Sequence, residues 1–186
     1  MSRFPGLISL QNVFFNEEGA LEFLQDEGIL PKEKECEACG GPTILLKPKL
    51  MFRCRKKNCR KGYAVRKGTF FANKCLPLDE ILLLGYLWLL KTPVTTLIIQ
   101  CGLSSATVDS YLGYFRQLVS DSSNEENLEI VDNRTVEENN ETEVDKRKHG
   151  TKKDMDERQW ELAWRRANKK NLWSAFLKAL RDVPYT

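Results

Sequence analysis

The sequence predicts an α+β protein made of small units, and three observations lead to this prediction. Apolar residues recur at helical spacing on both sides of a short segment that contains paired cysteines and two extended stretches. A polar, acidic tract then separates the last helices from the rest of the chain. With 186 residues, of which 41% are hydrophobic, the chain is long enough for one or two small domains.

The first unit, residues 1–31, is expected to contain one helix over residues 16–30. Asn16 has a side chain that can cap the first turn, and Gly28 is placed where a helix can end in a left-handed residue. We expect this helix to pack against the remainder of the protein without a direct role in function.

The cysteines give the strongest signal in the sequence. Four of them form two close pairs, Cys36 with Cys39 and Cys54 with Cys59. The pairs enclose two and four residues, and fourteen residues lie between them, so the four thiolates can close a tetrahedral site around one structural Zn²⁺. Extended stretches at residues 43–47 and 50–53 would form the hairpin. Residues 32–74 are therefore predicted to be a zinc ribbon, with a pair of disulfides as the alternative.

The other candidates for reactive chemistry give weaker signals. Cys75 and Cys101 stand beside apolar residues without a ligand at metal spacing, so we expect buried free thiols. His149 lies in a basic run and is expected to be exposed. The first six residues lack an apolar core of signal-peptide length, and no apolar run approaches the ~20 residues of a bilayer span. We therefore expect a reducing compartment and no membrane.

Charge is strongly segregated along the chain. Residues 32–74 carry 13 Lys or Arg against 3 Glu, residues 121–145 carry 10 acidic residues against one Arg, and residues 146–186 carry 12 basic against 5 acidic residues. A cationic face fixed on a metal-stabilised scaffold suits a phosphate backbone, whereas a solvated surface is the plain alternative. The predicted DNA contacts in the ribbon are Arg53, Arg55, Lys56, Lys57, Arg60, Lys61, Arg66 and Lys67, with Phe52 and Tyr63 interleaved.

Residues 75–120 are predicted to form a three-helix unit of the helix-turn-helix type. Helices are expected over residues 78–90, 95–100 and 105–119, with Gly102 in the last turn. The polar residues predicted to face DNA on the third helix are Ser105, Thr107, Ser110 and Arg116. Arginine is nearly absent from the start of that helix, so backbone binding is a stronger expectation than sequence readout. A simple packing unit of three helices is the alternative.

The last two units are an acidic spacer and a helical tail. Residues 121–145 are polar and acidic, which predicts a flexible linker. Residues 146–186 are predicted to form a helical hairpin, with helices over residues 151–168 and from Leu172 onward, the second capped by Asn171. The tail holds three of the four tryptophans, so it must dock on something: the protein's own helices, a second copy or a partner protein.

These pieces resemble the Merlin-type DNA transposases and their bacterial ISXO-type insertion-sequence relatives. The resemblance rests on the run Asp26-Glu27-Gly28-Ile29-Leu30, the four-cysteine ribbon, Arg66-Lys67-Gly68-Thr69-Phe70-Phe71, and the tail segments Trp164-Arg165-Arg166 and Asn171-Leu172-Trp173-Ser174-Ala175-Phe176-Leu177. It covers roughly three quarters of the chain. It implies a helix-turn-helix after the ribbon, duplex DNA as partner and, from the family's eukaryotic members, a nuclear rather than cytoplasmic location.

The same resemblance implies that the catalytic domain is missing. The family's RNase H-like domain holds three carboxylates around two metal ions, but only 26 residues separate Val119 from Lys146. Glu143 is the nearest match to a catalytic carboxylate, and one such group cannot carry out two-metal chemistry. The expectation is a non-enzymatic, transposase-derived, zinc-dependent DNA-binding protein. The alternatives are an adaptor that binds proteins through the ribbon and tail, and an active nuclease or transposase, either complete in itself or as a fragment that acts with a full-length relative.

Overall fold

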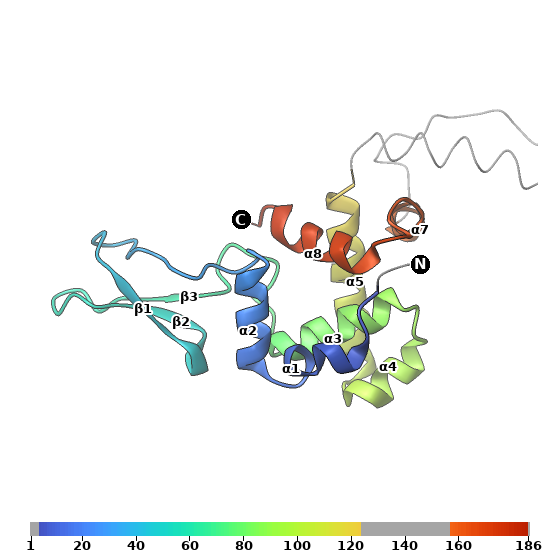
Figure 1. The fold of residues 1–186 in the computed structure, drawn as a ribbon, viewed down its shortest axis with the longest axis horizontal. Coiled ribbons are helices and arrows are strands. Elements are labelled where there is room, and N and C mark those ends of the chain that lie inside the picture. Colours follow the sequence, from blue (N-terminus) through green and yellow to red (C-terminus); the bar gives the residue numbers. More distant parts are fainter. Residues whose placement is uncertain (1–3, 124–156, 186) are drawn as a thin grey trace, which may run out of the picture.

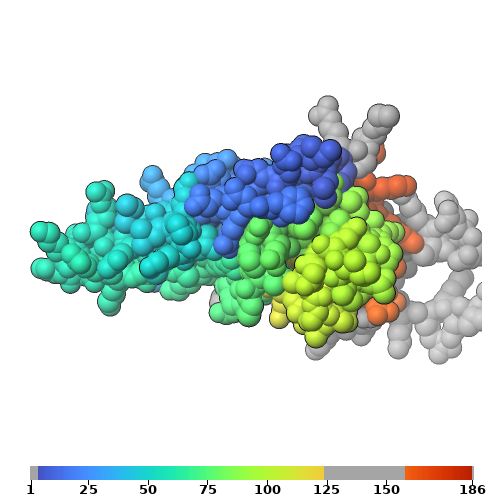
Figure 2. Space-filling model, turned by 90° about the horizontal axis from the view of Figure 1, so that it is seen from below, coloured from blue at the N-terminus to red at the C-terminus, as the bar shows by residue number. Residues whose placement is uncertain are grey.

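The computed structural model describes residues 4–123 and 157–185, and this part of the chain is α+β, as the sequence predicts. It contains seven α-helices and one three-stranded antiparallel sheet. The sheet projects from a helical body that contains helices from both the N-terminal and the C-terminal parts of the chain (Figure 1). In the space-filling view the turquoise segment, which contains the sheet, forms a narrow extension of that body (Figure 2). Most of the predicted linker, together with Glu143 and His149, lies outside the described residues.

A short helix that the sequence does not predict precedes the expected N-terminal one. The 3-10 turn η1 (Leu7–Leu10) and helix α1 (Gln11–Phe14) lead into α2 (Glu17–Asp26). Asn16 caps α2, because its side-chain oxygen accepts a hydrogen bond from a first-turn N–H at 3.0 Å. Gly28, with φ of +70°, lies just beyond the end of α2. The cap predicted from the sequence is confirmed.

The segment predicted to be a zinc ribbon, residues 32–74 and called the ribbon below, contains three strands rather than two. β1 (Thr43–Leu46) and β2 (Met51–Cys54) pair antiparallel across the 3-10 turn η2 (Lys47–Lys49). β3 (Gly62–Ala64) pairs with the other side of β2, so the strand order is β1-β2-β3. The third strand escapes prediction because three residues inside a basic run carry too little apolar alternation. Its strand geometry depends on the pairing with β2.

The next three helices follow the predicted order closely. They are α3 (Leu78–Leu89), α4 (Val94–Cys101) and α5 (Ser105–Asp121). Gly102 adopts a left-handed conformation, with φ of 64°, after the last residue of α4. Ser104 caps α5, because its side chain accepts a hydrogen bond from a first-turn N–H at 3.1 Å. Three residues therefore separate α4 from α5.

The C-terminal tail packs on the protein's own helices. α7 (Glu157–Ala167) lies against α5, and α8 (Leu172–Asp182) lies against α5 and α3. The three tail tryptophans are buried, at 3% to 6% exposure: Trp160, Trp164 and Trp173. Asn171 occupies the N-cap position of α8, but its side chain makes no capping hydrogen bond. Of the predicted docking alternatives, the structure therefore contains the intramolecular one.

A single aromatic-rich core joins the first, third and last predicted units into one helical body. The indole of Trp173 lies 5.6 Å from the ring of Tyr86 and 6.0 Å from that of Phe14, measured between centroids. The Gly-Thr-Phe-Phe run contributes Phe70 and Phe71, both at most 2% exposed, to the same core. The helical segments are therefore not separate small domains.

A buried arginine fixes the tail to α3. Arg165 is 7% exposed, and its guanidinium donates hydrogen bonds to the carbonyls of Trp88 and Leu89, each at 2.9 Å. Its Nε donates to Glu161 at 2.7 Å, and its guanidinium carbon lies 4.4 Å from the centroid of the Trp88 ring. Arg165 thus adds hydrogen bonds to carbonyls at the C-terminal end of α3, where the carbonyl of Trp88 also accepts from the N–H of Lys91 at 2.9 Å.

The two remaining cysteines are less buried than predicted. Cys75 is exposed and Cys101 is half-buried, so the prediction of two buried thiols is wrong. Cys75 lies in the connection before α3, where the neighbouring Leu76 provides the inward contact. The backbone N–H of Leu76 donates to the hydroxyl of Tyr111 on α5 at 3.1 Å.

Candidate metal centre and cationic knuckle

The four predicted ligands come together in one cluster. The Sγ atoms of Cys36, Cys39, Cys54 and Cys59 all lie within 4.8 Å of one another. The separations Cys36–Cys59 and Cys39–Cys54 are both 3.6 Å. A tetrahedral site with metal–sulfur bonds of about 2.3 Å requires sulfurs about 3.8 Å apart, so the cluster fits one metal ion. All four are free thiols, and the alternative of two disulfides is not what the structure contains.

Two knuckles with the same backbone pattern carry these cysteines. We call residues 36–41 the first knuckle and residues 54–61 the second knuckle. In each, the N–H of the first cysteine donates at 2.9 Å to the carbonyl two residues beyond the second cysteine: Cys36 to Gly41, and Cys54 to Lys61. The residue directly after the second cysteine is left-handed in both, Gly40 at φ +61° and Arg60 at φ +47°. The unequal spacings in the sequence therefore produce equivalent turns.

A tyrosine from β3 supports the first ligand. The hydroxyl of Tyr63 lies 3.2 Å from Sγ of Cys36 and accepts a hydrogen bond from the N–H of Ala38 at 3.0 Å. The hydrogen bond from Tyr63 is the largest cause that lowers the pKa of Cys36 to about 6, and the same contact raises the pKa of Tyr63 to about 12. A thiolate is the metal-binding form of cysteine, so this partner favours ligation. The sequence marks Tyr63 only as an aromatic among charges.

The cations of the ribbon divide into free and engaged groups. Five exposed side chains form no ion pair within the described part of the chain: Arg53, Arg55, Lys57, Arg60 and Lys61. Lys56 differs, because its Nζ donates to the carbonyl of Cys39 at 3.3 Å and its methylenes lie over Gly41. Lys56 therefore ties the two knuckles together. No acidic residue occurs between Glu37 and Asp79, so this surface contains no carboxylate of its own.

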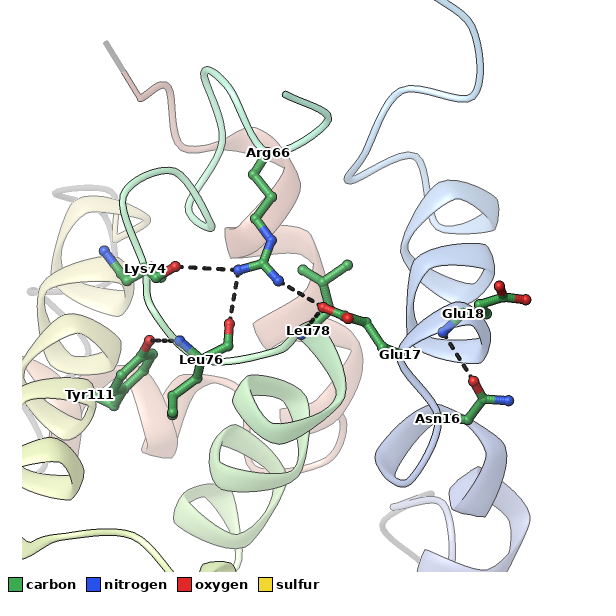
Figure 3. Close-up of polar contacts among 8 residues, drawn as sticks. All are labelled: Asn16, Glu17, Glu18, Arg66, Lys74, Leu76, Leu78 and Tyr111. Atoms are coloured by element: carbon green, nitrogen blue, oxygen red, sulfur yellow. Dashed lines mark hydrogen bonds and ion pairs between the residues drawn. The ribbon is translucent and has the colours of Figure 1, made fainter. Parts of the chain in front are cut away.

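Arg66 joins the ribbon to the helical body instead of facing solvent (Figure 3). It donates to Glu17 at 2.9 Å, to the carbonyl of Leu76 at 2.8 Å and to that of Lys74 at 3.3 Å. Glu17 also accepts from the N–H of Leu78 at 3.3 Å. The donors of Arg66 are thus directed at protein acceptors from two segments, α2 and the connection before α3.

Two other predicted DNA-contacting cations also have protein partners. Lys67 is exposed and pairs with Glu37 at 2.9 Å, an exposed ion pair that a phosphate can replace. Arg116 is half-buried and pairs with Glu161 of α7 at 3.3 Å. The sequence cannot reveal these pairings, because the partners lie far away along the chain.

The polar residues predicted on α5 mostly bond within that helix. Ser105 donates to Asp109 at 3.3 Å, and Ser110 donates to the carbonyl of Ala106 at 2.8 Å. Thr107 is held by the capping residue Ser104. The first eleven residues of α5 include no Lys or Arg, and Asp109 is exposed there. The exposed start of α5 is therefore not cationic.

The aromatic residues between the ribbon charges have structural positions. Phe52 is 1% exposed, and the Tyr63 hydroxyl faces the first metal ligand. Neither presents an open ring for stacking on a base. Among the described residues, the four cysteines form the one cluster of three or more metal-ligating side chains.

No protein-family model, no curated protein and no solved structure matches this chain. Within residues 4–123 and 157–185, each helix falls short of the length and apolar character that crossing a bilayer requires. The architecture and the cysteine cluster therefore define an α+β protein with a site for one metal ion.

Proposed function

We propose that this chain is a transposase-derived, non-catalytic protein that binds duplex DNA through a zinc ribbon. The observation that carries the proposal is the second knuckle together with the adjacent Arg53, where five exposed cations without an ion pair lie on a scaffold with a four-sulfur metal site. Zn²⁺ is the metal that such a closed four-thiolate site usually takes, and it would fix the geometry of the knuckle. Cys36, Cys39, Cys54 and Cys59 would hold it.

The electrostatics favour a polyanionic partner. Phosphates in duplex DNA are spaced closely enough for several to face one small cationic surface. If the five free cations each neutralise one phosphate, the slope of log K against log salt is about −4.5. Raising the salt from about 50 to about 200 mM would then weaken binding by about 500-fold. A plain solvated surface would not produce this behaviour.

We assign α3, α4 and α5 to a helix-turn-helix with a smaller role in DNA binding. The three-residue turn with Gly102 and the cap at Ser104 support the assignment. The uncharged start of α5 offers short hydroxyl groups and no arginine, so its contribution to base readout would be weak. The resemblance to transposases supports a nuclear location.

Salt-dependent binding of a labelled duplex tests the proposal. The variant Arg55→Ala/Lys57→Ala/Arg60→Ala should weaken binding at least 100-fold at about 100 mM salt and reduce the slope by about 2.7. The matched control, Lys169→Ala/Lys170→Ala/Lys178→Ala, removes the same charge from exposed positions of the tail and should bind nearly as the wild type does. Equal loss in both variants, or absence of binding by the wild type, would contradict the proposal.

The burial of the tail argues against the adaptor alternative. The three tryptophans of the tail are buried in the protein's own helical body, so they offer no apolar face to a partner. Strand transfer by the purified chain with Mg²⁺ or Mn²⁺, alone or with a full-length transposase, would instead favour a transposase fragment.

A further inference from the structure

The two faces of the ribbon sheet have different surroundings. Side chains alternate along each strand, so Phe52 and Cys54 of β2 share one face with Tyr63 of β3. This inner face is buried and contributes to the metal centre. We call the opposite face the outer face; its residues are Ile44, Leu46, Met51, Arg53, Gly62 and Ala64.

The outer face is not covered by the rest of the described chain. Ile44 is 49% exposed, and Arg53 and Gly62 are exposed as well. The apolar members Ile44, Leu46 and Met51 do not belong to the hydrophobic core. Gly62 and Ala64 on β3 have small side chains that project little from the outer face. The Met51 side chain lies over Gly62, where a Cβ atom would come within 2.7 Å of the Met51 sulfur. Neighbouring apolar residues on an exposed sheet face can form a docking surface.

The charges on the outer face indicate which partner it fits. Arg53 lies in the central strand, paired with Ile44 on one side and Gly62 on the other. Arg55 continues the same face, because its N–H bonds to the carbonyl of Pro42 at 3.0 Å and so extends the ladder by one residue pair. Neither arginine has an ion-pair partner in the described segments. The positive charge of this face therefore favours an anionic partner.

We infer that duplex DNA lies against the outer face, an inference that rests on the proposed DNA-binding function. Arg53 and Arg55 contact backbone phosphates, and Ile44 packs against the deoxyribose and base edges of the groove between them. Apolar side chains beside groove-facing arginines are a recurrent way in which proteins contact DNA. The charged and apolar contacts contribute differently, because only the former release counterions.

The salt titration separates these two contributions. Arg53→Ala should weaken binding about eightfold at about 100 mM salt and reduce the slope by about 0.9. Ile44→Thr keeps the β-branched shape but loses apolar surface, so it should weaken binding about fourfold with an unchanged slope. The matched control is Ile99→Thr on α4, where the isoleucine is 80% exposed but lies on another surface; it should bind as the wild type does. Zinc content and circular dichroism verify the fold of each variant.

The outcomes distinguish failure of this inference from failure of the proposed function. If the wild type does not bind DNA, both fall. If the wild type binds with a steep salt slope while Ile44→Thr matches Ile99→Thr and Arg53→Ala loses less than twofold, the outer face is not the docking surface. The DNA-binding function itself would then stand on the second knuckle.

A separate observation concerns the metal centre. Tyr63 is the one side chain other than the cysteines that hydrogen-bonds to a ligand sulfur within the described residues. Its hydroxyl bridges Cys36 and the N–H of Ala38, and so connects the first knuckle to β3. We propose that Tyr63 is a positioning residue for the metal: its O–H donates to Cys36 and holds that sulfur in place. Such outer-shell partners commonly change metal affinity by about 10- to 100-fold.

Replacement of the hydroxyl alone tests this role. Tyr63→Phe keeps the ring and should increase zinc transfer to a competing chelator by about 10-fold or more. In the Co²⁺-substituted protein, the sulfur-to-cobalt charge-transfer band should shift, because Cys36 loses a hydrogen bond. Tyr114→Phe on α5 is the matched control and should change neither quantity. Unchanged zinc affinity together with an unchanged cobalt spectrum in Tyr63→Phe would overturn the proposal.

Discussion

The ribbon and the helical body are stabilised in different ways. Between residues 32 and 64 the buried hydrophobic side chains are Cys36, Phe52 and Cys54, and two of these three are candidate metal ligands. The helical body, by contrast, buries aromatic and aliphatic residues from α1 through α8 in one core, and Phe52 of β2 is the strand residue buried in that same core. A segment as small as the ribbon cannot fold on so little apolar surface, so we infer that metal binding supplies its stability.

The largest predicted effect follows from this difference. Cys36→Ser should abolish metal binding, unfold the ribbon and weaken DNA binding by about 100-fold or more, because the cations of the second knuckle lose their fixed geometry. The helical circular dichroism signal and its thermal transition should persist, since the body has its own core. Elemental analysis, DNA titration and thermal melts measure the three quantities.

Cys75→Ser is the control for that experiment. Cys75 is exposed and is not part of the cluster, so its replacement should leave zinc content, DNA affinity and melting unchanged. Loss of the helical transition in Cys36→Ser would show that the two regions are not independent.

A cavity made in the core of the helical body should have the opposite effect to Cys36→Ser: the body should lose stability while the metal site is retained. Phe176 is 1% exposed, and its ring lies 5.5 Å from that of Phe115 and against the backbone of Gly85. Phe176→Ala should destabilise the body by about 3–5 kcal/mol, seen as a lower midpoint in denaturant, with one zinc per chain retained. Leu162→Ala, at a position that is 50% exposed, should cost less than about 0.5 kcal/mol. Zinc loss in Phe176→Ala would contradict the claim that the ribbon and the helical body are stabilised independently.

Removal of Arg165, which fixes the tail to α3, should destabilise the helical body less than the cavity does. Arg165→Ala leaves the carbonyl of Leu89 without its donor, removes one of two donors from the carbonyl of Trp88, and removes one of the two arginines that pair with Glu161. We expect a loss of about 2–3 kcal/mol in unfolding free energy, measured in urea. Arg166→Ala, its exposed neighbour, is the control and should be near neutral. An equal effect of both changes would show that Arg165 contributes only its charge.

The smallest expected effect concerns Asp79 in the first turn of α3. Burial is the main cause that raises its pKa, and its Oδ1 has no hydrogen-bond partner in the described structure. A raised carboxyl pKa means that stability is greatest while the group is neutral and is lost as the pH rises through that pKa. Asp79→Asn should therefore raise the free energy of unfolding at pH 7 by no more than about 1 kcal/mol, because the group is partly exposed, and the melting temperature should rise slightly. A difference between variant and wild type that grows as the pH falls would contradict this sign.

Short-range patterns in the sequence predict most of the local structure. The cap at Asn16, the turn at Gly102 and the cysteine pairs all depend on residues a few positions apart, and each is found where it is predicted. β3 depends on pairing with β2, and its three residues carry no period of their own. Prediction from the sequence therefore fails where the conformation of a segment depends on pairing with another segment.

Long-range pairings explain the differences in the candidate site. Arg66 bonds to Glu17, 49 residues away, and Arg116 bonds to Glu161, 45 residues away. From the sequence alone, Arg66 and Arg116 cannot be distinguished from Arg55, because the order of charges along the chain does not show which carboxylate each arginine meets in the fold. The docking of the tail is of the same kind: the three tryptophans predict that it docks, but only the tertiary structure selects the surface.

DNA affinity followed during withdrawal of the metal tests the central claim most directly. A zinc chelator is added in steps to the complex with labelled duplex, and released zinc and bound DNA are measured in the same sample. We expect DNA binding to fall in proportion to zinc release, to be lost after one equivalent per chain and to return when Zn²⁺ is added back. DNA binding that persists after all zinc is removed, or a protein that carries no zinc, would contradict it.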